Sequence, residues 1–255
     1  MSDLLYEVHE RIALITLNRP GAHNALSIET VELLAEASRA IQEDDRVLAA
    51  VITGAGDEAF CAGGDLAELL PALTDGHLEI LVPEPTQRFF SNVYKPIIAA
   101  VNGLCIAGGF EILLGTDLRV ASETASFGLA EVRWGLVPGA GAHVRLPAQV
   151  PWPIAMQLLL TGETIDAQRA YEVGLVNEIR PQAEALPRAI ELAERIAVNG
   201  PLAVQTAKEI AQRALGHERG FALEWGLQHR VLNSQDAQEG PRAFIAGRRP
   251  QFEGR

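Results

Sequence analysis

Two glutamates in apolar stretches are the residues of this sequence best suited to acid–base chemistry. Glu111 begins the run EILLG, and Glu131 follows FGLA. Burial would raise the pKa of each carboxyl group toward neutrality, where one group can accept a proton while the other donates one. A purely structural interpretation stays open, in which Glu111 favours a helix start and Glu131 pairs with Arg133.

Three glycine-bearing turns could supply backbone N–H donors beside these acids. They occupy residues 60–66 (FCAGGDL), 107–111 (AGGFE) and 135–141 (GLVPGAG). Glycine has no Cβ, so a ligand can approach the N–H groups of such a turn closely. Each turn taken alone is explained as well by the ordinary need for glycine in tight turns.

Other catalytic motifs are absent from the sequence. Ala59 stands where a dinucleotide-binding loop beginning at Gly54 would need its third glycine, and there is no Gly-x-Ser-x-Gly, Gly-Lys-Ser/Thr or His-Glu-x-x-His. We therefore expect no metal, nicotinamide or flavin cofactor. We expect Cys61 to be a small buried thiol, Asp65 to cap a helix, and His143 to be a polar turn residue.

The elements that must position these residues alternate between strands and helices in the first part of the chain. Such alternation predicts an α/β domain with largely parallel strands. A helix is predicted over 27–44, with Ser27 as its N-cap. Predicted strands cover residues 12–17, 47–53, 97–101 and 117–121.

The later part of the chain has helical periodicity. Residues 66–94 are irregular and are expected to form a mobile, partly helical excursion. We divide the chain into a core over 1–198 and a helical region over 199–255, which packs either on its own core or on another subunit. Predicted helices cover residues 153–160, 167–173, 186–198, 202–215, 218–232 and 235–246.

Composition narrows the class of protein. The net charge is −12, which argues against nucleic-acid binding. No run of 18 apolar residues is present, so a membrane span is not expected, and the acidic N-terminus does not resemble a signal peptide. Two separated cysteines fit a reducing compartment, and we expect a cytoplasmic protein.

Ordered motifs along nearly the whole chain resemble the enoyl-CoA hydratase/isomerase (crotonase) superfamily. Several motifs at compatible spacing are more specific than any one of them. The matching segments are LNRP (17–20), NAL (24–26), FCAGGDL (60–66), KPIIAAVNG (95–103), AGGFE (107–111), FGLAE (127–131), GLVPG (135–139) and LTG (160–162).

The resemblance implies a spiral of ββα units with a helical C-terminal region, assembled as a trimer or hexamer. It implies that Glu111 activates a water molecule, that Glu131 exchanges a proton at the substrate Cα, and that the N–H groups of Ala62 and Gly108 hold the thioester oxygen. The substrate would be an acyl-CoA thioester. The residues expected near it are Ala22, His23, Ala25, Gly64, Asp65, Leu66 and Gly109. Arg248 and Arg249 are expected at a coenzyme A phosphate, because arginine can bind phosphate through two hydrogen bonds.

Hydration of the 2,3 double bond of an enoyl-CoA is the activity that the resemblance favours. A Δ3,Δ2-enoyl-CoA isomerase or a carnitinyl-CoA-type dehydratase is the enzymatic alternative. A homologue that binds coenzyme A or RNA without turnover is the alternative from another class. Trp134, where small or aliphatic residues are common in the family, bears on the identity of the acyl group.

Overall fold

The computed structural model describes residues 2–254, and its largest element is a six-stranded sheet with the order β1-β2-β3-β5-β7-β10. Only β1 and β2 pair antiparallel; the other neighbours are parallel. Every residue of β3 and β5 is buried, as expected for a parallel sheet covered on both faces. The strands are β1 (Leu4–His9), β2 (Ile12–Leu17), β3 (Ala49–Gly54), β5 (Ile97–Val101), β7 (Leu118–Ser122) and β10 (Glu178–Arg180).

A second, four-stranded sheet has the order β4-β6-β8-β9. Its strands β4 (Ala59–Cys61), β6 (Leu104–Ile106) and β8 (Ser126–Gly128) each follow a strand of the larger sheet, and β9 (Thr164–Asp166) closes the edge. Each pair of strands leads into a helical segment, which gives the expected spiral of ββα units. These segments are α2 (Leu69–Thr74), α3 (Gly108–Leu114) and the 3-10 helix η3 (Glu131–Trp134) with α4 (Ala142–Gln149).

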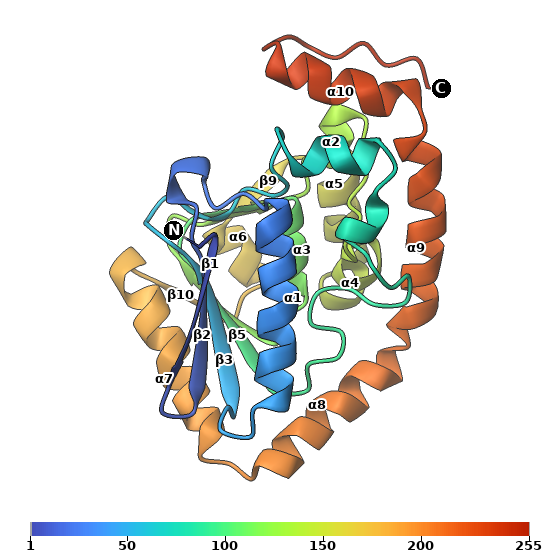
Figure 1. Ribbon diagram of the computed structural model, residues 1–255. Coiled ribbons are helices and arrows are strands. Elements are labelled where there is room, and N and C mark those ends of the chain that lie inside the picture. The colour runs from blue at the N-terminus through green and yellow to red at the C-terminus, as the bar shows by residue number, and fades with distance from the viewer. Residues whose placement is uncertain (1, 255) are drawn as a thin grey trace.

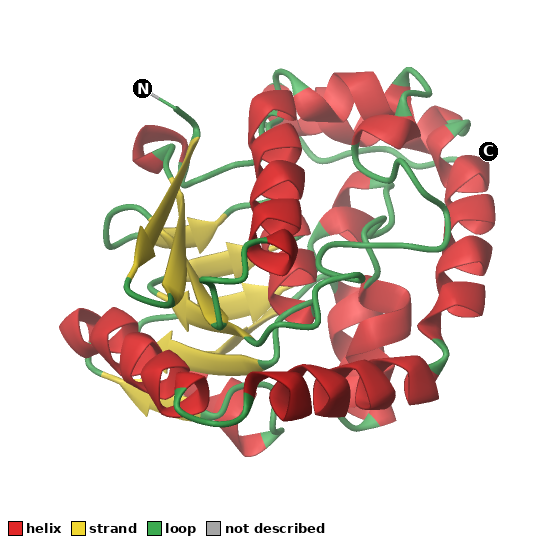
Figure 2. Cartoon of the chain, turned by 60° about the horizontal axis from the view of Figure 1, so that its bottom comes forward, coloured by secondary structure: helices red, strands yellow, loops and turns green. Residues whose placement is uncertain are grey.

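Helices cover both faces of the larger sheet (Figures 1 and 2). On one face, α1 (Ile28–Glu43) joins the main apolar core; Ser27 caps this helix by accepting a hydrogen bond from the Thr30 N–H, as predicted. On the other face, α7 (Ala185–Ala197) buries small alanines against β3 and β5. The helices α5 (Trp152–Thr161) and α6 (Ala167–Glu172) complete the core.

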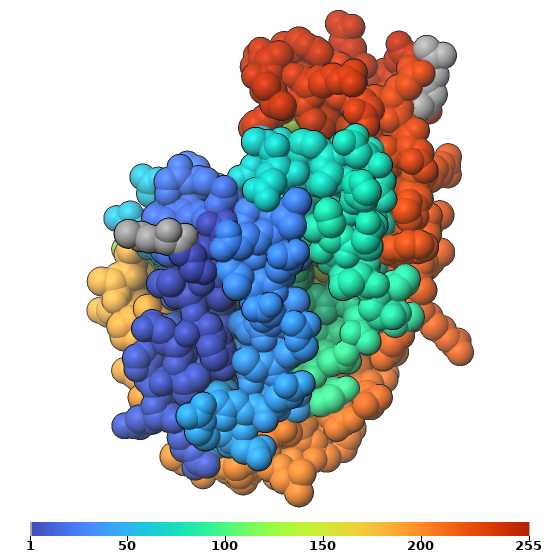
Figure 3. Space-filling view, in the orientation of Figure 1, coloured from blue at the N-terminus to red at the C-terminus, as the bar shows by residue number. Residues whose placement is uncertain are grey.

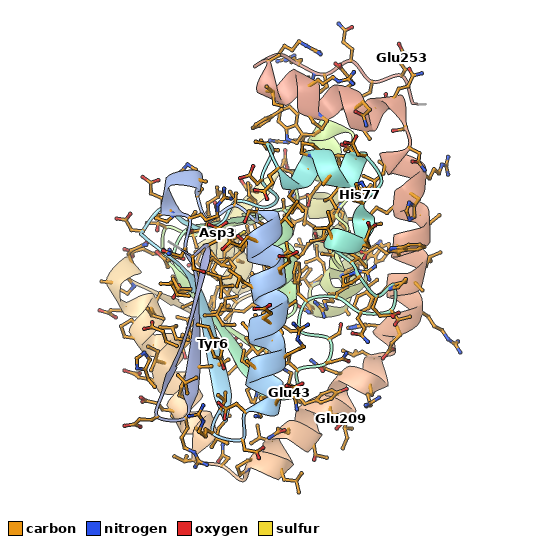
Figure 4. The ribbon with its side chains drawn as sticks, viewed as in Figure 1. Asp3, Tyr6, Glu43, His77, Glu209 and Glu253 are labelled. Carbon is orange, nitrogen blue, oxygen red and sulfur yellow. The ribbon has the colours of Figure 1, made fainter. Side chains whose placement is uncertain are left out.

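The last three helices fold back over the core of the same chain. They are α8 (Pro201–Leu215), α9 (His217–Leu232) and α10 (Gln235–Ile245). The helix α9 packs on α4, and α10 packs on η3. In Figure 3, α10 lies above the segment that contains α2. Figure 4 labels Glu209 on α8 and Glu253 beyond α10 at opposite ends of the molecule, which shows how far these helices reach.

The main strands and helices predicted from the sequence are present, with ends shifted by one or two residues. The region 66–94 contains only α2 and the 3-10 helix η2 (Leu78–Ile80) as helical turns. The division at residue 198 stays a prediction; it falls between α7 and α8. Among residues 2–254, no helix combines the length and apolar character needed to cross a bilayer.

Candidate active site

Glu111 lies in the first turn of α3, with only 2% of its surface exposed. Its Oε1 atom accepts hydrogen bonds from the N–H groups of Ala140 at 2.6 Å and Ala142 at 3.2 Å. Burial raises the pKa of Glu111 well above its usual range, and the negative charges of Glu131 and Glu224 raise it further. The two N–H donors oppose this shift, but they do not cancel it.

Glu131 begins the 3-10 helix η3 and faces the same cavity. The residue as a whole keeps some exposure, but its Oε2 atom is buried and makes no hydrogen bond among the described residues. Burial of the carboxyl group raises the pKa of Glu131 as well. The expected alternative, an ion pair with Arg133, does not form in the described part of the chain.

Two glycine-bearing loops meet beside these carboxyl groups. Gly109 lies so close to the first loop that a Cβ at this position would collide with the carbonyl oxygen of Cys61. Ala107, directly before α3, has a φ of 50° and a ψ of −128°, which is a costly conformation for a residue with a side chain. This conformation turns the chain into α3 and leaves the Gly108 N–H at the start of the helix.

One of the two backbone N–H groups expected to be free for a ligand is already used within the protein. The Ala62 N–H is not free, because it donates to the carbonyl oxygen of His23 at 3.0 Å. Within residues 2–254, the N–H groups of Gly64 and Gly108 donate to no other protein group. A Cβ added at Gly108 would lie 3.8 Å from the Gly64 nitrogen, so these two loops face each other. Gly64, and not Ala62, therefore has an N–H that is unused among the described residues, as Gly108 does.

Both glutamates and both free N–H groups line one cavity of about 220 Å³. Larger hollows exist elsewhere, such as one of about 880 Å³ beside α8, but they contain neither glutamate. Most of the remaining wall is apolar. It is formed by Leu26, Leu66, Leu69, Leu70, Leu73, Leu81, Ile106, Trp134, Leu136, Val137, Leu232, Pro241 and Phe244.

Of the residues expected to contact substrate, Leu66 and Gly64 line this cavity. The other expected contacts lie outside it: Ala22, His23, Ala25, Asp65, Gly109, Arg248 and Arg249. Asp65 does not cap α2, which begins at Leu69. Its carboxylate instead accepts a hydrogen bond from the Ala67 N–H and pairs with Arg19.

The structure also shows the surroundings of Cys61, His143 and Arg248, three further residues covered by the sequence-based predictions. Cys61 is fully buried, and burial raises the pKa of its thiol to about 12, so it is the unreactive thiol that was expected. His143 does not lie in a turn; it lies in α4 with its ring 3.1 Å from a carboxylate oxygen of Glu224. Arg248 pairs with Glu239 on the surface.

The helices α9 and α10 contribute to the site, which was not predicted from the sequence. Trp134 of η3 packs edge-on against Phe244 of α10, with ring centroids 4.6 Å apart, and both line the cavity. The buried face of α9 consists of Phe221, Glu224, Gln228 and Leu232. Glu224 and Gln228 are polar residues at positions that helical spacing places on the buried face of α9. They were the available sequence signal for this contribution, because buried polar side chains need a hydrogen-bond partner.

Comparisons with known proteins agree with this arrangement. A family model described as enoyl-CoA hydratase/isomerase matches residues 7–255. An enoyl-CoA hydratase of Mycobacterium tuberculosis is 40% identical, over 99% of this chain and 97% of that protein. A carnitinyl-CoA dehydratase of Proteus mirabilis is 38% identical, over 94% of each chain. A crystal structure of carnitinyl-CoA hydratase from Mycobacterium avium superposes with a TM-score of 0.90 at 39% identity, over the full length of both chains.

Proposed function

The chain belongs to the enoyl-CoA hydratase/isomerase family, and we propose that it adds water reversibly to the 2,3 double bond of an enoyl-CoA thioester. The observation that carries this proposal is the meeting of two carboxyl groups of raised pKa in one apolar cavity, beside two unused N–H donors. The names of the relatives support the same reaction class, and they leave the acyl group open.

Hydration needs one base and one acid at the same time. Glu111 accepts a proton from the water that attacks the substrate Cβ, and Glu131 delivers a proton to Cα. The reverse reaction exchanges these roles, so the pair must hold one proton between its two carboxyl groups near neutral pH. The raised pKa values of both groups support this, because ordinary glutamates would both be ionised there.

The thioester oxygen gains negative charge when water attacks Cβ. The N–H groups of Gly64 and Gly108 would stabilise this charge, since both residues line the cavity and neither N–H donates to another described protein group. Preorganised donors of this kind each contribute roughly 10²–10³ in rate. The strained backbone at Ala107 is consistent with such a role, because it sets the direction of the Gly108 N–H.

An isomerase can move a proton between two carbons with one base, so the presence of a second carboxyl group in the cavity favours a hydratase. The test is the rate at which the purified protein removes the conjugated absorbance of 2-enoyl-CoA thioesters, compared with its conversion of 3-enoyl-CoA thioesters. Hydration of the first supports the proposal. Conversion of 3-enoyl thioesters without any hydration would make the protein an isomerase.

The proposal extends to the conditions of the reaction. We propose that the carboxyl groups and N–H donors suffice without a cofactor; loss of activity on chelation, with recovery on adding a metal, would contradict this.

We propose that the protein works in the cytoplasm, where its two free buried cysteines stay reduced. We also propose that Arg248 and Arg249 contact a coenzyme A phosphate, which predicts weaker coenzyme A binding in the Arg248→Ala/Arg249→Ala double variant.

A further inference from the structure

Gln228 brings a polar group into a cavity wall that is otherwise largely leucine. It lies on the buried face of α9 with 4% of its surface exposed, and it lines the same cavity as Glu111 and Glu131. Its Nε2 atom occupies the space beside Gly139, where the side chain of any larger residue would lie. The amide is therefore fixed between α9 and the loop that precedes α4.

The side chain of Gln228 makes no hydrogen bond to any of the described residues, and its Oε1 atom is buried. One helical turn earlier, Glu224 is fully engaged: it pairs with Arg88 at 2.9 Å and contacts His143. An unpaired buried amide costs free energy, and a leucine or methionine would fill the same space without that cost. The amide is thus suited to a ligand that completes its hydrogen bonds.

The position of Gln228 identifies the part of the substrate that it would meet. Gly139, which it touches, precedes Ala140, and the Ala140 N–H donates to Glu111. In the proposed reaction Glu111 holds the water that attacks Cβ. With the water held there, the amide would lie on the Cβ side of the reacting carbons, where the acyl chain continues away from the thioester.

The charges around the cavity restrict the polar group that fits. Glu111 and Glu131, the two carboxyl groups of the cavity, disfavour an acyl group that carries a second carboxylate. Apart from these two groups, which the proposed reaction uses, the lining contains no charged side chain that could pair with a fixed cation. A hydroxyl group is neutral and can both donate to Oε1 and accept from Nε2, so it satisfies the amide without adding charge.

We propose that Gln228 selects enoyl-CoA thioesters whose acyl chain carries a hydroxyl group beyond Cβ. This inference rests on the proposed function and adds the substrate class to it. A site that hydrogen-bonds a substrate hydroxyl discriminates strongly against the analogue that lacks it, because the protein group is then left unpaired.

The first experiment measures binding without turnover. Saturated hexanoyl-CoA and its 4-, 5- and 6-hydroxy derivatives are titrated into the wild type and into Gln228→Met, which keeps the length of the side chain and removes its hydrogen bonds. We expect the wild type to bind one hydroxylated thioester at least about 10-fold more tightly than hexanoyl-CoA, and Gln228→Met to lose that preference. Arg230→Met, a change at an exposed position of the same helix outside the cavity, should keep it. Equal binding of all four thioesters by the wild type would overturn the proposal.

The second experiment compares hydration of 2-hexenoyl-CoA with that of its best hydroxylated analogue. We expect Gln228→Met to lower kcat/KM by about 10–100-fold for the hydroxylated substrate only. An equal loss on both substrates, in a variant whose melting temperature is unchanged, would mean that Gln228 acts on the attacking water instead. If the wild type hydrates neither substrate, the proposed function fails, and the binding experiment still decides the role of Gln228.

Discussion

At Glu111 and Glu131, the requirements of protein stability conflict most directly with those of catalysis. Both are held in an apolar cavity, and each makes ionisation of the other less favourable. Such a pair titrates as a unit, so one shared proton is expected over the neutral range. In the proposed mechanism, the proton that hydration moves would therefore already be present before substrate binds.

Replacing either glutamate tests the shared role. We expect Glu111→Gln and Glu131→Gln each to lower the hydration rate by at least about 10², with binding of a coenzyme A thioester nearly unchanged. The double variant should be little slower than the slower single variant, because the two groups act together. Steady-state kinetics and calorimetric binding measure both quantities. Near-full turnover in either single variant would disprove the two-carboxylate mechanism.

The buried carboxyl group of Glu131 predicts how the stability of the protein depends on pH. The folded protein binds a proton at Glu131 more tightly than the unfolded chain does, because burial raises the pKa. The folded state is therefore favoured most below the ordinary glutamate pKa, and this contribution is lost as pH rises through the raised value. Glu131→Gln removes the charge, so its melting temperature should exceed that of the wild type at alkaline pH and approach it in acid. A lower melting temperature at alkaline pH would contradict this account.

At the scale of elements, one buried ion pair anchors α9 to the core. The Arg88 and Glu224 side chains are almost fully buried, and the Arg88 guanidinium also donates to the carbonyl oxygen of Phe221. Because α9 carries Gln228 and Leu232 into the cavity, this pair fixes the far wall of the site. The wall thus depends on a contact between segments that are distant in sequence.

Breaking this pair should loosen α9. Arg88→Ala leaves Glu224 buried without its partner, which costs about 3–5 kcal/mol in the free energy of unfolding. The double variant Arg88→Met/Glu224→Leu should recover much of that loss, since it removes both charges. Denaturant unfolding measures each value, with Arg46→Ala, which breaks an exposed pair with Asp44, as a control that should change little. An equal loss in the single and double variants would show that the charge itself is not the cause.

Sequence periodicity predicted the long elements well, because β3, β5 and the helices bury continuous or regularly spaced apolar residues. It missed β1 and β10 of the larger sheet and all four strands of the smaller one, which at three residues each are too short to show an alternation. It also missed α4, where Pro147 lies inside the helix. The two glutamates were found from their motifs, whereas the choice between Ala62 and Gly64 depends on which N–H faces the cavity. That direction follows from a contact with His23 that only the folded chain makes.

At the scale of the whole molecule, α8 and α9 expose an apolar surface that the chain itself does not cover. Leu202 is 81% exposed and Leu223 is 63% exposed, and Ile210, Leu215 and Leu227 of the same two helices are exposed as well. Exposed apolar side chains on a surface commonly mark contacts between subunits. We propose that these helices contact other subunits and that the assembly is a trimer or hexamer.

Light scattering tests the assembly directly. We expect a mass three or six times the 27.5 kDa of the chain at micromolar concentration. The double variant Leu223→Glu/Leu227→Glu should dissociate, because it places charges on the apolar surface, and circular dichroism should show that its helices persist. A monomeric wild type would contradict the proposed assembly.

The far wall of the cavity has a consequence for the order in which the protein becomes functional on the ribosome. Both glutamates and both free N–H groups lie within residues 64–131, but Gln228, Leu232 and Phe244 close the cavity. Translation therefore produces every reactive group long before it produces the wall that completes the cavity. A nascent chain stopped after α7 would expose the leucines of the cavity to chaperones, and hydration would begin only when α9 and α10 had emerged and docked.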